Sequence, residues 1–126
     1  MPAAVRPALV EHARAEQPNE ACGLVLLKDG VAVEYRPGRN ALASPYRFRL
    51  EPGDPADFFA EDEGYELAVF HSHPETEAKP SRTDVANVGL WQGRPYLILS
   101  LARDELRAWR IEDGATTEVV ISLEHA

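Results

Sequence analysis

The sequence predicts one domain of the mixed α/β or α+β class over residues 1–126, and three observations support this. The length of 126 residues fits a single domain, without internal repeats or linker-like stretches. A segment with helical spacing of apolar residues precedes several strand-length apolar runs. Cys22 is the only cysteine, so no intrachain disulfide can form and the core must hold the fold.

The first elements predicted are a helix and a β-hairpin. Apolar residues recur at helical spacing over residues 7–16, which predicts a short amphipathic helix. Strand-like runs at 22–27 and 31–35 flank an Asp-Gly pair at 29–30, a strong hairpin signal. The Pro- and Gly-containing segment 36–40 is expected to be a loop.

The middle of the chain predicts a strand, a helix and a second strand. Residues 46–50 alternate apolar side chains with arginine, as in a half-buried strand. Residues 57–63 predict a short helix with Phe58 and Phe59 turned inward. The apolar run 67–70 then predicts a buried strand.

The remaining segments complete a fold of helices and strands. A helix is expected over residues 81–91, opened by Ser81. Residues 95–101 predict another buried strand, and 106–111 and 116–123 predict two more.

Charge and hydropathy exclude two classes of partner. The formal net charge of −8, without any Lys/Arg cluster, argues against nucleic acid. No apolar run approaches the roughly 20 residues that span a bilayer, and the N-terminus lacks a secretory pattern. We therefore expect a cytoplasmic protein without a membrane partner, whereas the sequence indicates no oligomeric state.

One stretch carries candidate metal ligands. His71 and His73 are two residues apart, and seven residues separate His73 from Ser81, which opens Ser-x-x-Asp84. Residues i and i+2 of an extended segment project from the same face, so both imidazoles can reach one ion. The intervening loop lets the chain turn back and bring Asp84 to the same point.

Three ligands are typical of a catalytic zinc ion. His71, His73 and Asp84 would supply two nitrogens and one oxygen, leaving a fourth position for a water molecule. Zinc lowers the pKa of such a water toward about 7, which makes hydroxide available near neutrality.

A simpler interpretation applies to part of this pattern. Ser81-x-x-Asp84 is also a capping box, and a His-x-His pair alone indicates little. The histidines at this spacing, in a strand, loop and helix context, favour metal binding, and Ser81 can serve both purposes.

The combined pattern resembles a known family. Pro18-Asn-Glu20-Ala-Cys-Gly-Leu, together with His71-x-His73-Pro, Ser81 and Asp84, is similar to the JAMM (MPN+) metalloproteases, and the resemblance covers nearly the whole chain. It implies a cytidine-deaminase-like fold in which a curved, mostly antiparallel β-sheet is flanked by two or three helices.

The resemblance also implies an activity and two residue roles. The family contains zinc isopeptidases of the deubiquitinase type, in which Glu20 would be the general base and Ser81 would steady the oxyanion. Periodicity alone does not select Glu20, and the simpler interpretation is a solvated acid, since helix–strand junctions commonly carry acids. Cys22 is expected to be a small core residue, with a regulatory role left open.

The short chain has no room for the substrate-binding insertions of eukaryotic deubiquitinases. It is similar to small bacterial enzymes that act on ubiquitin-like sulfur-carrier proteins, at an amide bond of a Gly-Gly C-terminus. Two alternatives stay open: a non-catalytic zinc-bearing module that binds ubiquitin-like tails, and a JAMM peptidase acting on other short peptides.

Overall fold

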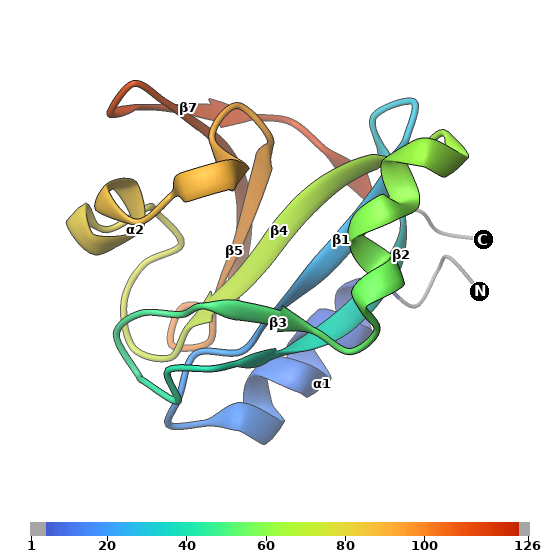
Figure 1. Cartoon of the computed structure of the whole chain (residues 1–126). Coiled ribbons are helices and arrows are strands. Elements are labelled where there is room, and N and C mark those ends of the chain that lie inside the picture. The colour runs from blue at the N-terminus through green and yellow to red at the C-terminus, as the bar shows by residue number, and fades with distance from the viewer. Residues whose placement is uncertain (1–4, 124–126) are drawn as a thin grey trace.

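The computed structural model describes residues 5–123 as one open β-sheet with helices on both faces (Figure 1). The strand order is β3-β2-β1-β4-β5-β6-β7, and β8 pairs with β2. The strands are β1 Cys22–Lys28, β2 Val31–Asn40, β3 Leu50–Pro52, β4 Glu66–His73, β5 Pro95–Ser100, β6 Glu105–Glu112, β7 Ala115–Val119 and β8 Ser122–Leu123.

The helices are few and short. They are α1 Val5–Glu16, the 3-10 helix η2 Pro55–Glu63, α2 Arg82–Ala86 and the 3-10 helix η3 Gly89–Trp91. Neighbouring strands are antiparallel except in the pairs β4–β5 and β2–β8. The predicted mixed α+β fold with a mostly antiparallel sheet is therefore confirmed. No helix among residues 5–123 is long and apolar enough to cross a membrane.

The sheet separates two apolar clusters. Side chains of successive strand residues point to opposite faces, so Val25 and Leu27 of β1 face one cluster while Leu24 and Leu26 face the other. Helix α1 covers the first cluster with Val5, Leu9 and Ala13. Ala60 of η2 and Trp91 of η3 cover the second cluster, on the face that carries the candidate ligands.

The first hairpin forms as predicted, but its second strand is longer. Asp29 and Gly30 both have positive φ, 53° and 79°, as a tight two-residue hairpin turn requires. Residues 36–40 are strand and not the predicted loop, because β1 and β3 pair with them on opposite sides. Gly38 permits this approach, since a Cβ there would lie 2.7 Å from the Glu51 carbonyl oxygen.

The predicted strand over 46–50 is wrong, since only its last residue belongs to β3. The N–H of Arg49 and the carbonyl of Arg47 bond to the side chain of Asn40. Local side-chain bonds therefore replace the strand pairing that the alternation indicated.

The helix predicted at 57–63 is present as the longer 3-10 helix η2, but its phenylalanines do not both point inward. Phe59 is 64% exposed and Phe58 37% exposed, whereas Ala60 is buried. A 3-10 helix has three residues per turn, so an inward face assigned with a period of 3.6 is displaced.

Two predicted elements are broken. The helix expected over 81–91 divides into α2 and η3, because Asn87 ends α2 by bonding to the Thr83 carbonyl and Gly89 has a φ of 55°. The strand expected over 116–123 divides into β7 and β8 around Val120, which is 95% exposed.

The loop between β4 and α2 is held in place by the core. The indole N–H of Trp109 on β6 donates to the carbonyl of Ala78, 2.9 Å away, and both residues are buried. This bond fixes the middle of the segment that brings α2 back to the end of β4.

Replacing Trp109 tests this anchor. We expect Trp109→Phe to lower the free energy of unfolding by about 1–3 kcal/mol beyond the loss of ring volume, because it leaves the buried Ala78 carbonyl without a donor. Urea denaturation of the metal-free protein measures the change. Trp91→Phe, in the same cluster, is the control for ring volume, and equal losses in both variants would contradict the anchor.

Candidate active site

The end of β4 presents two imidazoles on one face of the sheet. His71 and His73 share the face of Val69, whereas Phe70 belongs to the cluster beneath α1. Both histidines are buried, His71 completely. Their Nε2 atoms lie 2.9 Å apart, so the predicted convergence of the two rings is present.

The first turn of α2 brings Asp84 to the same point. Ser81 is the N-cap: its Oγ accepts from the N–H of Asp84 at 3.0 Å, and its own N–H donates to Asp84 Oδ2 at 2.9 Å. The capping box suspected from sequence therefore exists. It also fixes the carboxylate, because the bond to Oδ2 orients that oxygen toward the histidines.

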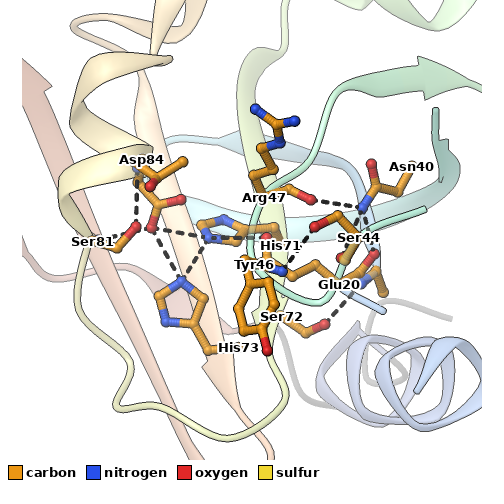
Figure 2. Close-up of polar contacts among 12 residues, drawn as sticks. Glu20, Asn40, Ser44, Tyr46, Arg47, His71, Ser72, His73, Ser81 and Asp84 are labelled. Atoms are coloured by element: carbon orange, nitrogen blue, oxygen red, sulfur yellow. Dashed lines mark hydrogen bonds and ion pairs between the residues drawn. The ribbon is translucent and has the colours of Figure 1, made fainter. Parts of the chain in front are cut away.

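Three ligand-type atoms form a tight cluster. Asp84 Oδ2 lies 3.1 Å from His73 Nε2 and 3.3 Å from His71 Nε2 (Figure 2). Tetrahedral ligands at about 2.0–2.1 Å from a zinc ion are roughly 3.3 Å from one another. The spacing of the cluster is thus close to that required by one ion.

The hydrogen bonds around His73 fix its ring. Its Nδ1 lies 2.8 Å from the Glu77 carbonyl oxygen, and this bond requires a proton on Nδ1. The other ring nitrogen, Nε2, lies 3.1 Å from Asp84 Oδ2. A hydrogen bond from the second ring nitrogen to a backbone carbonyl is typical of metal-binding histidines.

Aromatic rings enclose His71. Its ring stacks on Phe48 with centroids 4.5 Å apart and meets Tyr96 edge-on at 5.2 Å. Burial lowers the pKa of His71, although the carboxylate of Asp84 opposes the shift. The lowered pKa favours the neutral imidazole, the form in which histidine binds metals.

Asp84 is the ionised member of the cluster. Burial alone would raise its pKa, but His71, His73 and the Ser81 N–H hold the pKa of Asp84 well below its usual range. A buried carboxylate with these partners is an anionic ligand.

Glu20 faces the cluster from the junction between α1 and β1. Its Oε1 lies 4.0 Å from His71 Nε2 and has no hydrogen-bond partner within the described residues. Burial, followed by the charge of Asp84, raises the pKa of Glu20 to about 9. Glu20, His71 and His73 form a buried group whose ligand atoms lie within 4.8 Å of one another and can hold a metal ion.

A cleft of about 320 Å³ lies beside this cluster. Glu20, His73 and Ser81 line it, together with Pro45 and the 80% exposed Tyr46. The Oγ of Ser81 accepts from the helix, which leaves its proton available to a group in the cleft. No sequence pattern indicates that Tyr46 lies at this rim, because the alternation over 46–50 predicts a strand.

Ser72, between the two histidines, was not singled out from the sequence. Its side chain points to the opposite face, where Oγ accepts from the N–H of Ala21 at 2.8 Å. The N–H of Ser72 also donates to the Ala21 carbonyl at 3.0 Å. Ser72 thus fixes the residue next to Glu20, and the alternation of β4 is the signal that indicates its direction.

Relatives of known name match most of the chain. The CysO-cysteine peptidase of Mycobacterium tuberculosis is 37% identical over 124 residues, covering 92% of this chain and 84% of that protein. The desampylase of Pyrococcus furiosus is 31% identical over 110 residues, covering 83% and 76%.

Solved structures agree with the fold. A protein of Desulfitobacterium hafniense superposes with a TM-score of 0.77 at 30% identity, covering 96% of this chain and 89% of that one. A JAB1/MPN domain protein of Archaeoglobus fulgidus superposes with a TM-score of 0.59 at 18% identity, covering 92% and 88%.

Residues 2–112 match the family described as prokaryotic homologs of the JAB domain. The match includes the segment from Glu20 to Asp84, which contains the complete cluster and the cleft. This chain belongs to the prokaryotic JAB domain family.

Proposed function

We propose that this protein is a zinc-dependent peptidase or isopeptidase that hydrolyses an amide bond at the Gly-Gly C-terminus of a ubiquitin-like or sulfur-carrier protein. The observation that carries the proposal is the convergence of His71 Nε2, His73 Nε2 and Asp84 Oδ2 within 3.3 Å, beside the buried Glu20 carboxyl. The names of the two relatives support the reaction and the class of substrate.

In this proposal, His71, His73 and Asp84 would hold one zinc ion and leave a fourth position open to a water molecule. Zinc bound there would act as a Lewis acid and lower the pKa of that water. The alternative set of Glu20, His71 and His73 is less compact, since Glu20 Oε1 lies 4.0 Å from His71 Nε2 and Asp84 Oδ2 lies 3.3 Å from the same atom. The distances therefore favour Asp84 as ligand and leave Glu20 available as base.

Glu20 is the general base of the proposed reaction. Its carboxylate takes the proton of the attacking water and passes it to the departing amine. Burial raises the pKa of Glu20 to about 9, and a nearby cation favours the ionised form. Burial favours the protonated carboxyl and a cation favours the carboxylate, so Glu20 is suited to accepting and then releasing a proton.

Ser81 and the cleft act on the substrate. The hydroxyl of Ser81 donates toward the carbonyl oxygen on which negative charge develops, as an oxyanion-hole group does. The cleft volume of about 320 Å³ is at the lower end of the roughly 300–1,000 Å³ of ligand pockets. A narrow tail of glycines fits this space better than a peptide with large side chains.

Cleavage of a carrier adduct is the direct test. We expect the zinc-loaded protein to remove a cysteine attached to the terminal glycine of a sulfur-carrier protein, detected by intact mass. A carrier whose penultimate glycine is changed to leucine is the matched substrate control. Bound zinc without cleavage of either carrier would contradict the proposal and favour a module that binds tails; equal cleavage of both would indicate a peptidase acting on other short peptides.

The ligand set is tested by metal analysis. We expect His73→Ala and Asp84→Ala each to weaken zinc binding by about 100-fold or more, since two remaining ligands hold the ion poorly. Equilibrium dialysis with elemental analysis measures the affinity. His12→Ala, at a half-buried histidine bonded to Tyr35, is the control. Stoichiometric, tight zinc in either cluster variant would refute the assignment.

The base is tested by removing its charge with its shape preserved. We expect Glu20→Gln to lower kcat by about 10²–10⁴-fold, the usual range for general acid–base catalysis, while zinc stays bound. Loss of zinc in this variant would place Glu20 among the ligands. Retained zinc with an unchanged kcat would exclude Glu20 as the base.

A further inference from the structure

Asn40, at the end of β2, has a side chain that bonds to the backbone of two segments, the junction before β1 and the loop between β2 and β3. Its Nδ2 lies 3.1 Å from the Glu20 carbonyl oxygen, 3.0 Å from that of Arg47 and 3.5 Å from that of Ser44. Its Oδ1 accepts from the N–H groups of Leu42 and Arg49 at 3.0 and 3.1 Å. Figure 2 shows the carboxamide between Glu20 and the loop that carries Tyr46.

The chemistry of this contact set is specific to asparagine. A carboxamide offers two N–H donors and two acceptor sites, and here every one has a backbone partner. Aspartate lacks the donors and alanine lacks both functions. Since Asn40 is only 6% exposed, water cannot readily replace the lost bonds.

The bonds of Asn40 connect the two sides of the cleft. Residues 41–49 form the loop between β2 and β3, and that loop carries Pro45 and Tyr46 to the rim. The N–H of Glu20 donates to the Ser44 carbonyl at 2.8 Å, so the same loop also holds the backbone of Glu20. Ser72 holds Ala21 separately and does not depend on this loop.

We propose that Asn40 is a positioning residue that fixes the carboxyl of Glu20 and the Tyr46-bearing loop at one distance from each other. The proposal rests on the proposed function only where it treats Glu20 as the base and Tyr46 as part of the substrate cleft. Asn40 is not among the residues that line the cleft, and it acts through the backbone of Glu20 and of residues 42–49. A displacement of about 1 Å in such a constellation can cost about 100-fold in rate.

Hydrogen exchange of backbone amides tests whether Asn40 fixes Glu20 to the loop 41–49, and it needs no substrate. We expect Asn40→Ala to speed exchange at Glu20, Leu42 and Arg49 by about tenfold or more, while Ala21, held by Ser72, changes by less than about threefold. Asn40→Asp keeps the acceptor, so exchange should rise at Glu20 and less at Leu42 and Arg49. Asn87→Asp, the same change at an exposed helix-capping asparagine, should alter none of them.

Kinetics provide the second readout. In both Asn40 variants we expect kcat to fall by about 100-fold with zinc affinity unchanged, because the ligands lie on β4 and α2. Equal acceleration of exchange at Glu20 and Ala21, or a kcat that falls only with the folded fraction, would reduce Asn40 to a general structural role and overturn the proposal.

Two further outcomes also test whether Asn40 is a positioning residue. If neither variant folds, the exchange rates of the unsubstituted protein test the proposal. Protection factors of the Glu20, Leu42 and Arg49 amides within about tenfold of one another support the role of Asn40, and a wider spread overturns it. If the unsubstituted protein cleaves no carrier, the proposed function fails, while the exchange pattern still decides whether Asn40 fixes Glu20 to the loop.

Discussion

The alternation of side chains along β4 is the constraint on which the site depends. Because successive residues face opposite sides, His71 and His73 turn toward the cleft while Ser72 turns toward α1. One short segment thereby supplies two ligand-type nitrogens and also the hydroxyl that fixes the residue after Glu20. A one-residue change in the register of β4 would reverse all three directions.

The cluster concentrates polar groups where a folded protein normally avoids them. Glu20 Oε1 and His71 Nδ1 are buried without partners among the described residues, and Asp84 is held ionised beside them. Unsatisfied buried groups cost about 1–3 kcal/mol each, so the fold must hold them in place by other means. The backbone bonds of Ser72, Ser81 and Asn40 provide that restraint. Polar groups left without partners in a cleft are typical of sites that bind ions or substrates.

The sequence predicted the fold class and the residues of the cluster because both follow from local patterns. Strand-length apolar runs identified β1, β4 and β5, and the spacing of His71, His73 and Asp84 followed from strand and helix geometry. Glu20 is different, since no periodicity selects it and only family resemblance indicated it. Its position depends on the pairing of β1 with β4, which is a tertiary contact.

The two segments whose secondary structure was predicted wrongly, 36–40 and 46–49, also have a physical explanation. Residues 36–40 are strand because β1 and β3 pair with them. In the loop 46–49, the Arg47 carbonyl and the Arg49 N–H bond to the Asn40 carboxamide and not to a neighbouring strand. Asn40 carries no local signal of this role, since asparagine in a Pro- and Gly-rich stretch reads as a turn residue. Its function in the fold appears only when the junction before β1 and the loop between β2 and β3 are brought around it.

Ser81 shows why a structural and a chemical interpretation of one motif need not compete. In the cap, Ser81 Oγ accepts from the Asp84 N–H and Asp84 Oδ2 accepts from the Ser81 N–H, which leaves the hydroxyl proton of Ser81 unused. The same Oδ2 faces the Nε2 atoms of both histidines, so the capping box orients the carboxylate toward the cluster. A five-residue helix, too short to be stable alone, is held by the same two bonds that complete the cluster.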